Sequence, residues 1–328
     1  MITLPPRLSL AQTPTPLQLM PRVSDELGVR LWMKRDDLTG SVLSGNKVRK
    51  LEFSLAQAMQ QGCNHIITCG GLQSNHCRAT ALACAQLGLS VTLILRGDDS
   101  GPADGNLLLG KLAGAKVKTF APREYSAKLA EILEQEANAI NLSGDSAFII
   151  PTGASDAIGI WGYISAALEL QEGFSHRRIS PSHVVVATGS GGTQAGLALG
   201  ANLLGWETQV LGMAVCDDSD YFQKKVGKDI RDCINRYGLS VDPAAIDVQV
   251  NDQYIGPGYA QADQAVFDTI EWLARTEGIV LDPVYTGKAF LGLLSEIKAN
   301  RLEGARDIVF VHTGGVFGNF PYKEQFGV

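Results

Sequence analysis

The chain has 328 residues, of which 45 % are hydrophobic and 19 % charged, and its formal net charge is −6. This length and apolar content suffice for two packed domains and exclude wholesale disorder. The sequence has no Lys/Arg-rich run, no recognisable secretory signal and no apolar stretch of about 18 residues, which argues against nucleic acid or a membrane as a partner and predicts a cytoplasmic protein.

Short β-branched runs alternate with helical patterns along most of the chain. Strands are expected at residues 64–69, 90–96, 116–120, 148–150, 183–188, 209–215 and 307–312. Helices are expected after Lys47 and at residues 74–87, 103–113, 124–138, 155–171 and 192–204. This alternation favours α/β architecture with mostly parallel sheets and helices on both faces. No linker rich in glycine, serine or proline marks a boundary between domains.

The six cysteines are spread through apolar segments and form no CxxC pair. They are Cys63, Cys69, Cys77, Cys84, Cys216 and Cys233. This pattern is more typical of buried thiols in a reducing compartment than of a zinc site or a disulfide framework. We therefore expect no metal site.

The loop TGSGGTQAG at residues 188–196 is the clearest candidate for ligand binding. It follows an expected strand and opens an expected helix, whose first backbone N–H groups suit a phosphate. A dinucleotide fingerprint fails because Gln194 replaces the third glycine, and no Lys-Ser/Thr pair follows to complete a Walker loop. The motif predicts a cradle for one phosphate, although the glycines could also serve a tight turn alone. Further glycine-bearing turns occur at residues 44–50, 70–75, 151–155 and 312–315.

Lys47 lies in the sequence SGNKVRKLE, between a glycine turn and an expected helix. A lysine must be neutral to attack a carbonyl, and burial beside another cation lowers its pKa; Arg49 and Lys50 are close enough in sequence to have this effect. Alone, Lys47 reads more simply as a solvated residue in a basic turn. Together with a phosphate cradle, a lysine amine matches the needs of pyridoxal 5′-phosphate.

Five motifs, taken in order, give a more specific resemblance. They are SGNKVRKLE, GGLQSNHCRA, TGSGGTQAG, LDPVYTGKA and HTGG, within a region that runs from KRDD to HTGG. This series resembles the fold-type-II pyridoxal phosphate enzymes, the tryptophan-synthase-β-like group. Within that group it is similar to the D-cysteine desulfhydrase and 1-aminocyclopropane-1-carboxylate deaminase family.

The resemblance implies a role for each matching residue. Lys47 matches the Schiff-base lysine, Asn75 the partner of the phenolic oxygen of the cofactor, and Thr313 the hydroxyl facing the pyridine nitrogen. The phosphate loop matches Gly189, Ser190, Gly191, Gly192 and Thr193. Substrate binding or proton transfer is implied for Gln73, Ser74, Asn75, His76, Tyr259 and Tyr285. Without the resemblance, Ser74 reads as a helix cap and His76 as a neutral histidine at a helix start. On the same ground, Tyr259 is predicted to be an aromatic residue in a turn, and Lys288 a lysine on the surface of a helix.

The implied reaction is a β-elimination with D-cysteine as the expected substrate. The substrate amine would displace Lys47, the α-proton and then hydrosulfide would leave, and pyruvate and ammonia would result. The deaminase branch carries a glutamate directly after the tyrosine that matches Tyr285, whereas this chain has Thr286. A threonine hydroxyl can bond an unprotonated ring nitrogen, so β-elimination is favoured over opening of a cyclopropane.

Other functions stay open at this point. Within the family they are 1-aminocyclopropane-1-carboxylate deamination and reactions of cysteate, β-chloroalanine or D-serine. A non-catalytic protein that binds pyridoxal phosphate or another phospholigand is an alternative of another class. A nicotinamide-dependent oxidoreductase is a third, which the broken glycine pattern disfavours.

The family also implies an architecture of two open three-layer α/β/α domains with the cofactor between them. The smaller domain is expected at residues 48–160, inserted into a larger one formed by residues 1–47 and 161–328. A homodimer is expected on the same ground.

Overall fold

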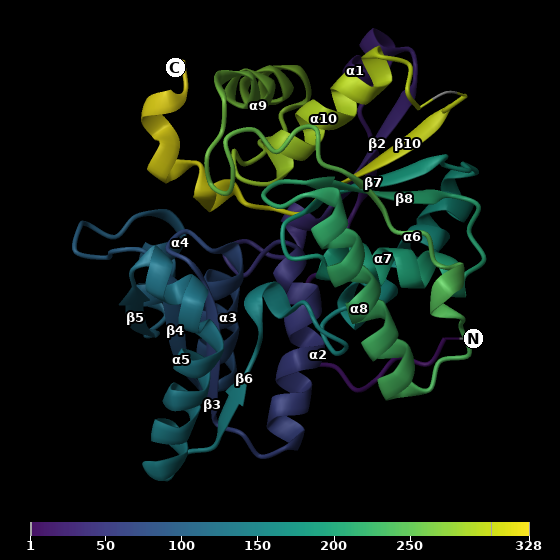
Figure 1. Ribbon diagram of the computed structural model, residues 1–328. Helices are drawn as coiled ribbons and strands as arrows, with labels where there is room; N and C mark the ends of the chain where they lie inside the picture. Colours follow the sequence, from purple (N-terminus) through teal and green to yellow (C-terminus); the bar gives the residue numbers. More distant parts are fainter. Residues whose placement is uncertain (1, 303, 328) are drawn as a thin grey trace.

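The computed structural model describes residues 2–302 and 304–327, and its strands form two separate sheets (Figure 1). The strands are β1 (Leu17–Leu19), β2 (Arg30–Arg35), β3 (His65–Gly71), β4 (Ser90–Arg96), β5 (Lys116–Phe120), β6 (Ala147–Ile149), β7 (His183–Thr188), β8 (Gln209–Ala214), β9 (Gln249–Asn251) and β10 (Asp307–His312). The helices are α1 (Pro21–Leu27), α2 (Asn46–Gln60), α3 (Asn75–Leu87), α4 (Gly105–Leu112), α5 (Pro122–Leu142), α6 (Trp161–Arg177), α7 (Gly192–Leu203), α8 (Ser219–Tyr237), α9 (Gln264–Glu277) and α10 (Thr286–Lys298). Among the described residues, no helix combines the length and apolarity needed to cross a membrane.

The smaller sheet has the strand order β5-β4-β3-β6, and all its pairs are parallel. Its two faces are covered separately. Ile66 of β3 packs with side chains of α2, α3 and α4, whereas Ile67 packs with side chains of α5 such as Ile132. Successive side chains of a strand point to opposite faces, so the run of apolar residues in β3 serves both cores. The sheet and its helices form the lower left part of Figure 1.

The larger sheet has the strand order β1-β2-β10-β7-β8-β9, with only the β1–β2 pair antiparallel. Val184 and Val186 of β7 pack in the core beneath α6, α7 and α8. Val185 lies in the core of the opposite face, with α9 and α10. Strand β10 lies between β2 and β7, so the sheet joins segments from the two ends of the chain.

The two three-layer α/β/α domains with mostly parallel sheets confirm the predicted fold class. The helix expected at residues 155–171 begins later, at Trp161, which corrects that prediction. The cause is local, because Asp156 Oδ1 accepts hydrogen bonds from the N–H groups of Ile158 and Gly159, at 3.1 and 2.7 Å, and closes a turn there. Such side-chain bonds compete with a helix.

Helix α2 contributes to both domains. Leu51 and Leu55 belong to a core of the smaller domain, whereas Phe53 belongs to a core of the larger one. Arg49, on the same helix, pairs with the buried carboxylate of Asp36 at 2.8 Å and with Glu169 at 2.9 Å. This helix therefore links the domains, and the limits at residues 47/48 and 160/161 stay a prediction.

Candidate active site

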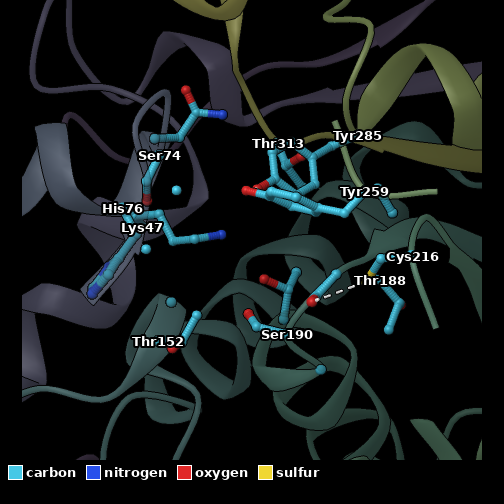
Figure 2. A pocket seen from close by; sticks show the side chains of 18 of the residues that line it. Lys47, Ser74, His76, Thr152, Thr188, Ser190, Cys216, Tyr259, Tyr285 and Thr313 are labelled. Carbon is cyan, nitrogen blue, oxygen red and sulfur yellow. Dashed lines mark hydrogen bonds between the residues drawn. The ribbon is translucent and has the colours of Figure 1, made fainter. Parts of the chain in front are cut away.

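A cavity of about 290 Å³ lies between the domains, where the carboxyl ends of several parallel strands meet. This is the usual ligand position in open α/β sheets. The cavity brings together most of the predicted site residues: Lys47, Ser74, Asn75, His76, Gly189, Ser190, Gly191, Thr193, Tyr259, Tyr285 and Thr313. Figure 2 shows Lys47 and Ser74 on one side of this pocket, Tyr259 and Tyr285 on the other, and Ser190 below them.

Two predicted residues, Gln73 and Gly192, are not among the described residues that line the pocket. The side chain of Gln73 is engaged at the start of α4, where it donates to the carbonyl of Asp104 (3.0 Å) and accepts from the N–H of Asn106 (2.9 Å). The N–H of Gly192 donates to Ser155 Oγ at 3.1 Å. Direct contact of Gln73 and Gly192 with a ligand stays a prediction.

Lys47 stands at the start of α2, after Gly45, whose φ of 89° suits the turn into the helix. Its Nζ donates to Asn46 Oδ1 at 3.1 Å, and Asn46 Nδ2 donates to Thr193 Oγ1 at 2.9 Å. Asn46, which we had not singled out from the sequence, therefore connects the lysine to the glycine-rich loop.

Burial lowers the pKa of Lys47 to about 8; the charge of Asp282 opposes this shift and that of Arg78 adds to it. Arg49 and Lys50 are not among the causes of the lowered pKa of Lys47, although Lys47 and Lys50 repel each other and this repulsion adds to the lowered pKa of Lys50. Arg49 is neutralised by its carboxylate partners, and burial lowers the pKa of Lys50 itself well below its ordinary value. A pKa near 8 leaves a useful fraction of Lys47 neutral near physiological pH.

The glycine-rich loop between β7 and α7 has the geometry of an anion site. Gly191 is the residue before α7, its φ is 85°, and no side chain of its own caps the helix. Ser155 approaches from another segment, and its Oγ lies 2.9 Å from Ser190 Oγ. A Cβ on Gly192 would lie 2.5 Å from Ser155 Oγ, so the close approach of Ser155 to this loop requires glycine at position 192. The buried Lys50 lies 3.4 Å from Ser155 Oγ and is a second residue missed from the sequence.

The start of α3 lies on the same side of the pocket as Lys47 (Figure 2). Ser74 Oγ accepts from the N–H of Cys77 at 3.2 Å, which confirms the helix-cap interpretation. Asn75 Oδ1 accepts from Asn106 Nδ2 at 3.0 Å, so the Nδ2 group of Asn75 keeps its donors for a ligand.

His76 has a defined hydrogen-bonding state. Thr68 Oγ1 donates to the carbonyl of Ile150 at 2.8 Å and lies 2.7 Å from His76 Nε2. Because a hydroxyl has one hydrogen to give, His76 must donate from Nε2, and Nδ1 then carries a lone pair. That Nδ1 is buried without a hydrogen-bond partner among the described residues. Burial first, and the charges of Lys47 and Lys50 next, lower the pKa of His76 well below 6.5, so the ring is neutral as expected.

The opposite wall carries two tyrosines whose hydroxyl oxygens are 2.8 Å apart. Burial raises the pKa of both Tyr259 and Tyr285, so both hydroxyls stay protonated at neutral pH. Only one hydrogen lies between the two oxygens, and the other remains available to a substrate atom. The guanidinium of Arg96 stacks over the Tyr259 ring at 5.0 Å from its centre.

Thr286 and Lys288, on the first turn of α10, differ from their expected placement. Thr286 is fully buried, and its hydroxyl donates to Asp282 Oδ1 at 2.6 Å and accepts from the Asp282 N–H at 2.8 Å. It therefore has no hydroxyl hydrogen left for a ring nitrogen, whereas Thr313 lines the pocket. Lys288 is 1 % exposed, so its interpretation as a surface lysine is wrong.

Comparison with known proteins assigns this chain to a family. The family model of pyridoxal-phosphate dependent enzymes matches residues 8–314. The chain belongs to that family. It is therefore an enzyme that uses pyridoxal phosphate, rather than a nicotinamide-dependent or non-catalytic protein.

Relatives and a solved structure agree with this assignment over nearly the whole chain. The bifunctional D-cysteine desulfhydrase/1-aminocyclopropane-1-carboxylate deaminase of Arabidopsis thaliana is 40 % identical over 335 residues, covering 97 % of this chain and 80 % of the relative. The D-cysteine desulfhydrase of Klebsiella pneumoniae (strain 342) is 38 % identical over 326 residues and covers 98 % and 97 %. The crystal structure of an ACC deaminase homologue superposes with a TM-score of 0.90 at 36 % identity and covers 98 % and 95 %.

The pocket fits this cofactor on its own geometry. The start of α7 would bind the phosphate, because its N–H groups are buried and Gly191 provides no side-chain cap for them. The amine of Lys47, whose pKa of about 8 leaves part of it neutral, would react with the aldehyde. The free Nδ2 donors of Asn75 suit a phenolic oxygen, and Thr313 supplies a hydroxyl at the end of β10.

Proposed function

We propose that this enzyme catalyses β-elimination from a small amino acid, with D-cysteine as the substrate and pyruvate, hydrogen sulfide and ammonia as products. The observation that carries the proposal is the pairing, across one pocket, of a lysine amine with a pKa of about 8 and two protonated tyrosine hydroxyls. The names of the Arabidopsis and Klebsiella relatives support the substrate. When bound, pyridoxal phosphate supplies an electron sink for the charge that develops at Cα.

The residues of the chain divide the remaining work. Lys47 would hold the cofactor through its Nζ, and the same Nζ in its neutral form would take the proton from Cα of the substrate. Ser74, with the N–H groups at the start of α3, holds the substrate carboxylate, because a helix start favours an anion. The Tyr259–Tyr285 pair gives its free hydrogen to the departing sulfur. These assignments are part of the proposal.

Deamination of 1-aminocyclopropane-1-carboxylate is the second candidate, which the name of the bifunctional Arabidopsis relative favours. Thr286 does not argue against it, because its hydroxyl hydrogen is bound to Asp282 and Thr286 is not among the described residues that line the pocket. The residue at position 286 therefore does not distinguish the two reactions.

A direct test measures release of the 2-oxo acid product, which is pyruvate from D-cysteine, L-cysteine and D-serine and the four-carbon 2-oxobutanoate from 1-aminocyclopropane-1-carboxylate, together with sulfide release from both cysteines. D-Cysteine is expected to give equal amounts of pyruvate and sulfide, and Lys47→Ala is expected to release both at least about a hundredfold more slowly. Absence of both products with both cysteine enantiomers would contradict the proposed substrate, and 2-oxobutanoate from the cyclopropane with no product from the other substrates would establish the second candidate.

The proposal extends to assembly, location and domain limits. We propose a cytoplasmic homodimer with a smaller domain at residues 48–160 and a larger one at residues 1–47 and 161–328. Sedimentation equilibrium of the cofactor-loaded enzyme tests the dimer, because a mass near that of one 35.0 kDa chain would contradict it.

A further inference from the structure

Lys288 is a buried cation that the proposed reaction does not use. It lies in the first turn of α10 and is 1 % exposed. Its Nζ donates to three backbone carbonyls, those of Gly258 at 2.7 Å, Ile255 at 2.8 Å and Val215 at 3.3 Å. Three carbonyl acceptors require three N–H donors, so the contacts are those of the charged ammonium.

Burial of the Lys288 ammonium costs free energy, which suggests that the charge has a role in the protein. No carboxylate of the described residues forms an ion pair with Lys288; the three carbonyls hold its ammonium directly, and Asp263 and Asp282 attract it only from beyond contact distance. A cation in the first turn of a helix also opposes the helix dipole. An apolar residue of similar length would fill the same space without these costs.

The three carbonyls belong to segments that form the pocket. Gly258 directly precedes Tyr259, and Val215 directly precedes Cys216, which lines the cavity. The segment before Tyr259 contains Gly256 and Gly258, and glycine restrains the backbone less than any other residue. The Lys288 ammonium is a tie that restrains this segment from outside, alongside the hydrogen bonds that Gln261 and Tyr322 donate to the carbonyls of Gly258 and Ala260.

Helix α10 connects this tie to the second tyrosine. Tyr285 is the residue directly before α10, and Lys288 is the third residue of that helix. The ammonium thus joins the loop of Tyr259 to the helix that begins beside Tyr285. The hydroxyl contact of 2.8 Å between the tyrosines spans the same two segments on the pocket side, where Figure 2 shows both rings.

We propose that Lys288 is a positioning residue whose ammonium ties residues 255–258 to α10 and β8, and so fixes Tyr259 against Tyr285. The tie itself is a property of the protein. Its effect on turnover rests on the proposed function, in which the tyrosine pair faces the substrate. Lys288 touches neither substrate nor cofactor and acts through Tyr259.

The tie is tested by amide hydrogen exchange in the cofactor-loaded enzyme. Lys288→Met keeps the length of the side chain and removes its charge, and Lys298→Met changes an exposed lysine of the same helix. Residues 255–261 are expected to exchange about tenfold faster or more in Lys288→Met, because hydrogen bonds to a charged group are lost, and at the wild-type rate in Lys298→Met. Equal exchange in the two variants overturns the proposal.

The consequence for turnover is tested by kinetics. A displaced Tyr259 is expected to lower kcat for D-cysteine by up to about 10²-fold with little change in KM and with the absorbance of the lysine-bound cofactor retained. The double variant Lys288→Met/Tyr259→Phe is expected to be no slower than Tyr259→Phe, whereas losses that multiply would refute action through Tyr259.

Two further results have defined meanings. If Lys288→Met does not fold, Lys288→Gln, which retains part of the donor set, is expected to show intermediate exchange in residues 255–261, and wild-type exchange there overturns the tie. If the wild-type enzyme releases no 2-oxo acid from any of these substrates, the proposed function fails, while hydrogen exchange still decides on the tie.

Discussion

Two strand–turn–helix junctions face the pocket from different domains, and their helices begin in different ways. At the β3–α3 junction, Ser74 caps its own helix by accepting from the N–H of Cys77. At the β7–α7 junction, Gly191 offers no side-chain cap, and one N–H is taken by Ser155 from another segment. At the first junction the cap residue itself satisfies the N–H of Cys77, whereas the second junction has no side-chain cap of its own and leaves buried donors for a ligand.

The difference shows how one geometry serves two tasks. A capped start is rigid before any ligand arrives, which suits the wall that carries the reacting groups. An open, buried start has unmet hydrogen bonds that an anion can satisfy, which suits phosphate. The residue at the end of the turn, serine or glycine, decides between the two.

Replacement of Lys47, which lies between the junctions, should have the largest effect. Lys47→Ala is expected to lower kcat by about 10²-fold to 10⁴-fold from loss of the base alone, while leaving both helix starts intact. The variant should still bind pyridoxal phosphate without the absorbance of the lysine-bound form, as measured by equilibrium dialysis and spectroscopy. Activity within tenfold of the wild type would contradict the role of Lys47.

The pH dependence of cofactor capture sharpens the role of the same lysine. Only the neutral amine attacks the aldehyde, and the pKa of Lys47 is about 8. The rate of binding to the cofactor-free protein should therefore rise about tenfold per pH unit below 8 and level off above it. Stopped-flow absorbance measures this rate, and a continued rise to the pKa of an ordinary lysine would show that burial does not perturb Lys47.

Gly191→Ala should damage the open junction. Its φ of 85° is left-handed, and an L-residue there costs about 1–2 kcal/mol, which is expected to weaken cofactor binding roughly tenfold. Gly205→Ala is the matched control, because Gly205 has a φ of 66° with nothing within 4 Å of an added Cβ and lies outside the pocket. Both variants should lose stability, but only Gly191→Ala should lose affinity in a fluorescence titration.

Ser74→Ala should damage the capped junction and gives the smallest effect on stability. Loss of the Oγ acceptor is expected to lower the free energy of unfolding by about 1 kcal/mol. Ser74→Thr keeps an acceptor and should recover most of that loss in denaturant titrations. If Ser74→Ala is as stable as the wild type, α3 is not held by its cap and the contrast between the junctions fails.

The sequence predicted the features that depend on local pattern. The apolar runs at residues 183–188 and 307–312 indicated parallel strands buried on both faces, and the ordered glycine motifs indicated the cofactor pocket. Gly191 and Ser74 could be assigned because turn geometry and capping involve only neighbouring residues.

Features that depend on distant contacts were not predictable in the same way. Ser155 reaches Gly192 from another segment, and nothing in its own neighbourhood shows this. Lys288 looked like a surface lysine because the carbonyls that bury its charge come from loops far away in sequence. Gln73 lies beside true pocket residues, but the start of α4 takes its amide. Residues 219–237 and 264–277 form helices that carry no recognised motif.

The position of β10 between β2 and β7 has a consequence for biosynthesis. The smaller sheet is complete once residue 149 has been made, so that domain can fold while the rest of the chain is still being translated. The larger sheet lacks an internal strand until residue 312 leaves the ribosome. The pocket wall from the smaller domain can therefore form before the wall from the larger domain, and the complete cofactor site exists only when the chain has been synthesised almost to its end.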